Sequence, residues 1–454
     1  MTVTTATLVA RDKLRRIRYG WYMYDWANSA FAITILAALF GPYFDKVVVP
    51  AGGVNIPLLG IQGLSSTSLY GYTLGGSALL VLLSAPVLGA IADHTSAKRA
   101  FLFFFAWLGS ASSLLMFFVG PGDVVLAMLL FFLGNFSFVS ANVFYDAFLP
   151  HIAAPEEQDL VSGRGYAYGY AGGGLLFLLQ LGLVQFHESL GIADMGTAIR
   201  IALGSVGLWW GGFSFVTFLR LEEPPLIGRR PPVGALIRSG FARITGTLRV
   251  LPKLRHMGLF LLAFMIYNDG IQTVIAMATI YGSAELGFDT LTLMGCLLMI
   301  QFVGIGGAQL FGYSAQRLGG KTMLMVSLLI WTGVVVYAFF MTQPHEFWIL
   351  GAIVGLVLGG SQALSRSLYS RIIPPSASAE FFGFFSVFEK FSAIWGPIAF
   401  AFIRQITGSS RMSIIALVLF FIVGLVLMAF VNFRKAEHDR EAVERALGES
   451  GEGV

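Results

Sequence analysis

The sequence predicts an all-α membrane protein with twelve transmembrane helices, arranged as two six-helix bundles that repeat in parallel. Composition is the first observation: of 454 residues, 56% are hydrophobic and only 12% are charged, whereas a soluble domain carries about 25% charged residues. The second is a succession of apolar runs of about 20 residues, the length that a helix needs to cross a bilayer. The third is an internal repeat, because two motifs of the first half return in the second half at nearly the same offset.

The twelve predicted spans follow one another with short loops, except at two places. They lie near residues 20–44, 68–92, 100–119, 124–148, 162–186, 198–219, 256–282, 291–314, 321–341, 346–370, 380–404 and 410–432. The first long loop, 45–67, contains glycine and proline, and the second, 220–255, is a basic, proline-containing segment. We therefore predict an N-terminal bundle (1–219), a cytosolic linker (220–255), a C-terminal bundle (256–432) and a cytosolic tail (433–454). The tail mixes both charge signs and is expected to stay in solvent.

Lysine and arginine predict the orientation, because cytosolic loops of membrane proteins carry an excess of these residues. The even-numbered loops, both termini and the linker hold nearly all of them. The opposite side holds only Lys46, Arg200, Arg404 and Arg411. The sequence therefore predicts a multi-pass protein of the cell (inner) membrane with both termini in the cytosol.

Cysteine labelling tests this orientation. We expect single cysteines placed in 50–65 to react with a membrane-impermeant maleimide added outside intact cells. Cysteines placed in 225–245 should be protected, because the basic linker is predicted to lie in the cytosol. The opposite labelling pattern would overturn the orientation and the side assigned to the gate.

A short polar turn between two apolar spans carries the first repeated motif. Residues 89–99 place Asp93, Lys98 and Arg99 between the second and third spans, and 312–321 is a fainter copy. The residues that match at an offset of 223 are Gly89 and Gly312, Ala92 and Ala315, and Lys98 and Lys321.

A second pair of matches strengthens the repeat. Tyr145 and Pro150, at the end of the fourth span, match Tyr369 and Pro374, at the end of the tenth, at an offset of 224. Two independent matches at nearly one offset indicate two parallel halves, each with six helices.

These residues carry a resemblance to a known superfamily. The turn at 89–99 resembles the loop that joins the second and third helices of each half in the major facilitator superfamily. The runs 21–31, 365–375 and 380–392, the last followed by Gly396-Pro397, resemble the vacuolar amino-acid effluxer-like family of that superfamily, and the compact chain resembles its bacterial members. The resemblance implies the major facilitator fold, a central site between the two bundles and export of a small solute such as a neutral amino acid.

The resemblance also implies which charged residues form the gate. In the superfamily, the carboxylate at the position of Asp93 holds the inner gate closed by pairing with a helix end in the other half, which here would start near Ala379. The residues predicted to act in gating are Asp93, Lys98, Arg99, Asp146, Arg317 and Lys321.

Polar side chains inside predicted spans are candidates for substrate binding, because charges in a membrane are costly and their usual role is functional. These candidates are Asp25, Asn28, Asn268, Asp269 and Arg366. Asp25 has the alternative of a helix-start carboxylate. Arg366 has two alternatives: it closes the inner gate, or it extends to the membrane interface.

Three deep charges are candidates for proton coupling: Glu389, Lys390 and Asp269. Glu389 is the first choice as proton carrier, Asp269 is its rival, and Asp25 is a third candidate that lies closer to the membrane surface. Adjacent helical residues diverge by about 100°, so Lys390 is expected to pair with a charge on another helix, for which Asp269 is a candidate. The alternative is a buried structural ion pair.

Other function classes lack their motifs. The single cysteine, Cys296, excludes a disulfide framework, and the histidines lack metal-ligand spacing. The sequence also shows no combination of nucleophile, base and orienting group that would indicate an enzyme. We therefore predict no catalytic residue, no cofactor, no metal and no nucleic-acid partner. The expected partners are a small-molecule substrate, the lipid bilayer, and protons or sodium as the coupling ion, with the protein a monomer. The alternatives are an ion-coupled symporter for uptake of another small organic solute, and a non-transporting receptor or lipid translocase.

Overall fold

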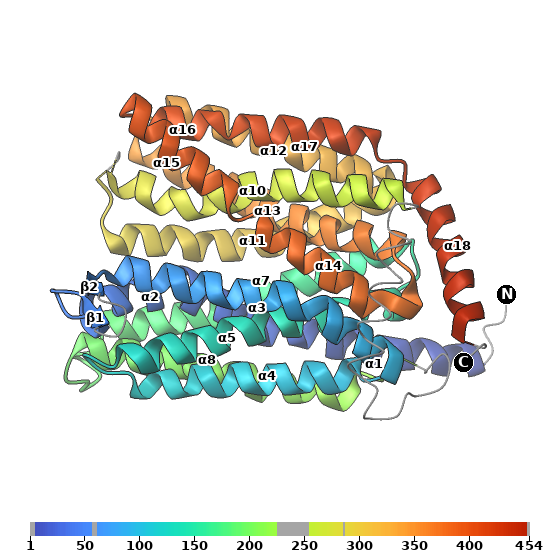
Figure 1. Cartoon of the computed structure of the whole chain (residues 1–454), viewed down its shortest axis with the longest axis horizontal. Coiled ribbons are helices and arrows are strands. Elements are labelled where there is room, and N and C mark those ends of the chain that lie inside the picture. Colours follow the sequence, from blue (N-terminus) through green and yellow to red (C-terminus); the bar gives the residue numbers. More distant parts are fainter. Residues whose placement is uncertain (1–4, 57–60, 225–253, 285–286, 452–454) are drawn as a thin grey trace. The chain divides into compact units, whose positions relative to one another are not determined.

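The computed structural model describes residues 5–56, 61–224, 254–284 and 287–451, and these residues are nearly all helical (Figure 1). Among them, eleven helices are long and apolar enough to cross a membrane. A bent pair at the start of the chain, Arg11–Ala38 and Phe40–Val48, makes twelve if it is counted as one span. The predicted fold class, an all-α membrane protein, is thereby confirmed.

The helices of the first half match the predicted spans closely. They are α1 (Thr5–Ala30), which continues as the π-helix η1 (Phe31–Ala38), α2 (Phe40–Tyr43), η2 (Phe44–Val48), α3 (Ser66–Thr95), α4 (Lys98–Leu115), η4 (Met116–Phe118), α5 (Val124–Asp146), α6 (Leu149–Ile152), α7 (Gln158–Gln185) and α8 (Met195–Arg220). The predicted loop 45–67 also contains a small antiparallel pair, β1 (Val54–Ile56) and β2 (Ile61–Leu64), with Val54 opposite Leu64 and Ile56 opposite Ile61.

The second half follows the same pattern and ends in an additional helix. Its elements are α10 (Arg255–Ala284), α11 (Thr290–Leu318), α12 (Gly320–Phe340), α13 (Pro344–Ile372), the 3₁₀ turn η7 (Pro375–Ala377), α14 (Ser378–Phe391), α15 (Trp395–Thr407), α16 (Ser410–Ala416), α17 (Val418–Phe430) and α18 (Phe433–Gly451). Most of the predicted basic linker, residues 225–253, lies outside the described residues.

Contacts divide the chain into two compact units that do not follow the order of the sequence. The first unit comprises residues 1–84, 99–145 and 168–222, and the second comprises 85–98, 146–167 and 223–454. The second unit thus takes the end of α3, all of α6 and the start of α7 from the first half of the chain. The bundle limits predicted from sequence, 1–219 and 256–432, stay a prediction.

Aromatic packing organises the first unit. Trp21 stacks on Tyr145 with ring centroids 4.5 Å apart, and its indole N–H donates to the Tyr145 carbonyl at 2.9 Å. At the π-helical turn, Thr34 donates to Gln180 at 2.6 Å, and Gln180 donates in turn to the Ala202 carbonyl at 2.9 Å. A buried polar network therefore fixes the first span where it departs from α-helical geometry.

Glycines allow close helix contact in the second unit. A Cβ added at Gly307 would lie 2.1 Å from the Leu356 carbonyl oxygen, and one at Gly355 would lie 2.9 Å from the Ile300 carbonyl oxygen. Helices α11 and α13 therefore pack backbone to backbone, as small residues permit between membrane helices.

The predicted eleventh span, 380–404, is broken rather than continuous. Helix α14 ends at Phe391 and α15 begins at Trp395. Ser392, between them, donates to the Glu389 carbonyl at 2.6 Å and accepts from the Asn268 side chain at 2.5 Å. Side chains of α10 thus satisfy polar groups that the break releases.

The tail departs from its predicted solvated state, because residues 433–451 form helix α18, which packs in the second unit. Ala436 and Val443 are only 2% and 8% exposed, and Phe433 meets Phe260 of α10 with ring centroids 5.9 Å apart. The apolar face of this helix was not predicted, because charged residues of both signs dominate the segment. Positions 436 and 443 are seven residues apart and therefore lie on one helix face.

Candidate gate and buried polar sites

Asp93, at the end of α3, binds the start of α14. Its Oδ1 accepts from the Ala379 N–H at 3.2 Å and its Oδ2 from the Glu380 N–H at 2.9 Å. The first N–H groups of a helix have no partner within the helix, and a carboxylate there also interacts favourably with the helix dipole. The predicted contact between Asp93 and a helix that begins near Ala379 is confirmed.

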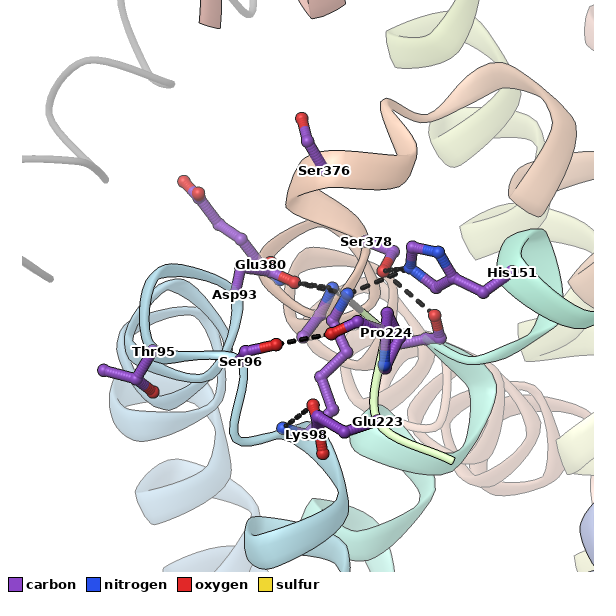
Figure 2. A network of polar contacts seen from close by, with 12 residues as sticks. Asp93, Thr95, Ser96, Lys98, His151, Glu223, Pro224, Ser376, Ser378 and Glu380 are labelled. Atoms are coloured by element: carbon purple, nitrogen blue, oxygen red, sulfur yellow. Dashed lines mark hydrogen bonds and ion pairs between the residues drawn. The ribbon is translucent and has the colours of Figure 1, made fainter. Parts of the chain in front are cut away.

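Lys98, at the start of α4, neutralises the same carboxylate. Its Nζ lies 2.9 Å from Asp93 Oδ1, and the two side chains are 5% and 0% exposed. The Lys98 ammonium also donates to His151 Nε2 at 3.0 Å, as Figure 2 shows for the labelled residues around the turn. A lysine so fully buried is retained because its charge is paired and hydrogen-bonded.

Residues next to this ion pair complete the cluster. The Lys98 backbone N–H donates to Glu223 Oε1 at 2.8 Å, and Ser378, which precedes Ala379, donates to the Ala147 carbonyl at 2.9 Å (Figure 2). Segments of α3, α4, α6 and α14 are therefore held together by polar contacts inside the second unit.

Two glycines let α3 and α14 approach closely enough for these bonds. A Cβ added at Gly89 would lie 2.3 Å from the Ala379 carbonyl oxygen. A Cβ added at Gly383 would lie 2.8 Å from the Ala85 carbonyl oxygen. Both obstacles are backbone atoms, which cannot rotate away, so these positions require glycine while Asp93 holds α14.

Arg366 of α13 forms a second contact between sequence-distant segments. Its Nη1 lies 3.0 Å from Asp146 Oδ1, its Nε donates to Ser162 Oγ at 2.9 Å and its Nη2 donates to the Ser162 carbonyl at 3.0 Å. Its guanidinium also lies over the Tyr166 ring, 4.2 Å from the centroid. Three nitrogens of Arg366 therefore have protein acceptors in the second unit, and its predicted roles in substrate binding and in gating stay predictions.

Sequence reasoning missed a third contact, between Asp159 of α7 and Arg371 of α13. Arg371 Nη2 lies 2.5 Å from Asp159 Oδ2, and Ser367 donates to Asp159 Oδ1 at 2.5 Å. Asp159 is only 1% exposed. Asp159 lies three residues before the predicted span 162–186, where a carboxylate resembles an ordinary helix-start residue, and only the arginine at position 371, one of two in the run 365–375, indicated a partner.

Three predicted gating residues lie elsewhere. Arg99 donates to the Phe218 carbonyl at the end of α8. Arg317 is exposed and lies over Tyr313 of its own helix, 5.3 Å from the ring centroid. Lys321 donates at 2.8 Å to the carbonyls of Ala429 and Val431, at the end of α17. Arg99 and Lys321 thus bind carbonyls at helix ends, where cations interact favourably; the gating role of all three residues stays a prediction.

Two substrate-binding candidates lie together in the first unit. Asp25 is 7% exposed and accepts from the Tyr145 hydroxyl at 2.7 Å. Asn28, one helical turn further along α1, donates to Asn142 Oδ1 at 2.6 Å. Both side chains project from α1 toward α5, which satisfies their polar atoms.

The other pair lies on α10 in the second unit. Asn268 and Asp269 are 4% and 2% exposed. Asp269 Oδ1 accepts from the Gly396 N–H at 2.8 Å, so this carboxylate caps the start of α15 just as Asn268 binds Ser392 at the end of α14. The predicted Asp269–Lys390 pair is not formed among the described residues. Backbone N–H groups at a helix start take the place of the cation.

Glu389 and Lys390 occupy the last turn of α14, before the break. Both are partly exposed, and no described residue forms an ion pair with either of them. The side chains of Glu389 and Lys390 are therefore less buried than that of Asp269, and their role in proton coupling stays a prediction.

Solved structures define the class of protein. The chain resembles the major facilitator superfamily transporter FucP in its outward conformation, with a TM-score of 0.67, 14% identity and coverage of 92% of this chain and 98% of that one. It resembles the human organic anion transporter MFSD10 with a TM-score of 0.66, 14% identity and coverage of 91% and 99%. The fold is therefore the one that major facilitator superfamily transporters share.

Sequence comparison then gives the family. Residues 13–441 match the family described as "Vacuole effluxer Atg22 like", and the chain belongs to it. It is 35% identical over 413 residues to the "Uncharacterized MFS-type transporter YxiO" of Bacillus subtilis strain 168, covering 91% of this chain and 94% of that protein. It is 24% identical over 558 residues to "Autophagy-related protein 22-2" of Emericella nidulans, covering 97% and 94%.

Proposed function

We propose that this transporter exports a small solute, with neutral amino acids as the substrate class, by alternating access coupled to protons. The observation that carries the transport mechanism is the binding of Asp93 to the first N–H groups of α14. This contact joins the ends of two elements that lie almost 290 residues apart in the chain. Residues that join the two halves of the chain at one end of the spans are suited to a gate that opens and closes once per cycle.

Three carboxylates of the first half share this function in the proposal. Asp93 holds α14, while Asp146 and Asp159 hold α13 through Arg366 and Arg371. All three are bonded to groups that are themselves buried or partly buried. These contacts exist only in the closed arrangement, so a solute or ion that binds the open arrangement more tightly would shift the population toward opening.

The substrate class is supported by the family and by the chemistry of the buried polar residues. Relatives in the family are described as vacuole effluxers. In the first unit, Asp25 provides a carboxylate and Asn28 an amide at buried positions of α1. Such groups can recognise the ammonium and carboxylate of an amino acid, whereas the apolar surroundings fit an uncharged side chain.

A ligand screen tests the substrate class. We expect neutral amino acids to raise the thermal unfolding midpoint of the purified protein and to compete with one another in isothermal titration. A ligand at 100 times its Kd stabilises the folded state by about 2.7 kcal/mol. Charged amino acids, sugars and nucleosides are the comparison set. Heat of binding with a sugar or nucleoside, and none with any neutral amino acid, would reject this substrate class.

A further inference from the structure

The C-terminal helix α18 is fixed to the gate-bearing part of the second unit by two charged residues. Arg440 Nη1 donates to the Arg371 carbonyl at 3.0 Å, and its Nη2 reaches Glu441 Oε1 at 3.5 Å. The Ser376 N–H donates to the Glu444 carboxylate at 3.3 and 3.4 Å. Because Arg440 and Glu444 are four residues apart, they lie on one face of α18, the face that also buries Ala436.

The charges match the helix ends that they contact. Arg440 binds a carbonyl in the last turn of α13, where the helix dipole favours a cation. Glu444 binds an N–H just before α14 begins, where the dipole favours an anion. One face of α18 thus contacts both sides of the short connection between α13 and α14.

That connection lies between the gate contacts. Arg371, whose carbonyl Arg440 binds, uses its own side chain to hold Asp159. Ser376, which Glu444 binds, stands three residues before Ala379, whose N–H holds Asp93. A shift of the connection would therefore misplace both donors, the Arg371 guanidinium and the Ala379 N–H, at once.

We propose that α18 is a brace that positions the ends of α13 and α14 for gate closure, with Arg440 and Glu444 as its positioning residues. The brace contacts α10, α13 and η7, all in the second half of the chain. It therefore acts by holding the end of α13 and the start of α14 in a fixed geometry. Ordering these two helix ends beforehand lowers the entropy cost of each gate closure. The inference rests on the proposed role of Asp93 as a gate residue.

A cysteine reporter measures gate opening without knowledge of the substrate. Ser378 is fully buried beside the Asp93 contact, and Ser378→Cys adds a thiol there with little change in size. The reporter is made with Cys296→Ala, which removes the native cysteine. The rate of maleimide labelling of the purified full-length protein then reports how often the gate opens.

We expect Arg440→Ala to raise the labelling rate about tenfold, which corresponds to about 1.4 kcal/mol. Arg440→Lys, which keeps the charge and a donor, should restore most of the protection, and Glu444→Gln should have an intermediate effect. Arg445→Gln is the matched control, because Arg445 is exposed and its Nε binds only the Glu441 carbonyl of its own helix.

Asp93→Asn separates the two hypotheses. If Asp93→Asn raises labelling and Arg440→Ala does not, the brace is refuted while the gate stands. If Asp93→Asn leaves labelling unchanged, the gate itself is refuted. The brace further predicts that Asp93→Asn and Arg440→Ala are not additive, because both act on the same closed contact; full additivity would contradict it. Equal labelling in Arg440→Ala and Arg445→Gln would also contradict it.

Discussion

Replacing Gly89 by alanine is expected to open the gate more strongly than any other single methyl group added to α3. The new Cβ would lie 2.3 Å from the Ala379 carbonyl oxygen and 2.8 Å from the Glu380 Cα. Both are backbone atoms in the two residues whose N–H groups bind Asp93. The closed contact cannot form without moving α3 away from α14.

The size of the effect follows from the cost of overpacking, which is about 1–3 kcal/mol. Each 1.4 kcal/mol is tenfold in an equilibrium constant. With the Ser378→Cys reporter, we therefore expect maleimide labelling to rise roughly ten- to a hundredfold in Gly89→Ala. Transport should slow because the closed state is reached less often.

Two other glycines of the same helix provide matched controls. A Cβ at Gly71 or Gly75 would meet no other atom within 4 Å. Gly71→Ala and Gly75→Ala should therefore leave labelling unchanged and stabilise the helix slightly, since alanine is a better helix former. Parental labelling in Gly89→Ala would show that α3 and α14 do not close as described, and would remove Asp93 from the gate.

Asp269→Asn is expected to abolish solute accumulation driven by a pH gradient while solute exchange continues. Asp269 is 2% exposed and caps the start of α15 through the Gly396 N–H. Asparagine keeps the oxygen that accepts this bond but cannot gain or lose a proton. The broken span should therefore keep its shape while coupling is lost.

The assay uses liposomes that contain the purified protein and the amino acid identified by the binding screen. A pH difference of one unit provides about 1.4 kcal/mol per proton, which supports about tenfold accumulation for one proton per solute. We expect this ratio in the parent and a ratio of about one in Asp269→Asn. Exchange of labelled for unlabelled solute at equal pH should remain in both.

Glu389→Gln is the companion variant, because sequence reasoning placed the proton first on Glu389. Its partly exposed position in the last turn of α14 predicts near-parental accumulation. If Glu389→Gln loses accumulation and Asp269→Asn does not, the role belongs to Glu389. If Asp269→Asn loses exchange as well, Asp269 is a structural cap for α15 rather than a proton carrier.

The contacts of Arg366 change how this residue is interpreted. Its depth in a predicted span alone would suggest a substrate ligand. In the structure its guanidinium is shared between Asp146 and Ser162 and lies over Tyr166. A buried arginine whose donors are already satisfied stabilises one conformation of the transporter, and its loss would leave Asp146 without this partner.

The sequence by itself determined the class and the twelve spans. A run of about 20 apolar residues must cross the bilayer as a helix, because backbone polar groups in lipid have to be satisfied within the segment. This is a local constraint, so hydropathy located the eleven long apolar helices and the bent pair that are found among the described residues. The Asp93 contact with the start of α14 was expected from the resemblance of the turn at 89–99 to the superfamily's loop, and the free N–H groups of a helix start give that contact its physical basis.

Only the tertiary structure decided which charges meet. Asp159 binds Arg371 across 212 positions of sequence, Lys98 binds His151 rather than solvent, and Asp269 caps α15 instead of pairing with Lys390. The docking of α18 was likewise not predicted, because it combines a narrow apolar face with hydrogen bonds to backbone groups of α13 and η7. Such pairings depend on which faces of distant helices are brought together and on how closely glycines let them approach, and neither property is contained in the local pattern of any one segment.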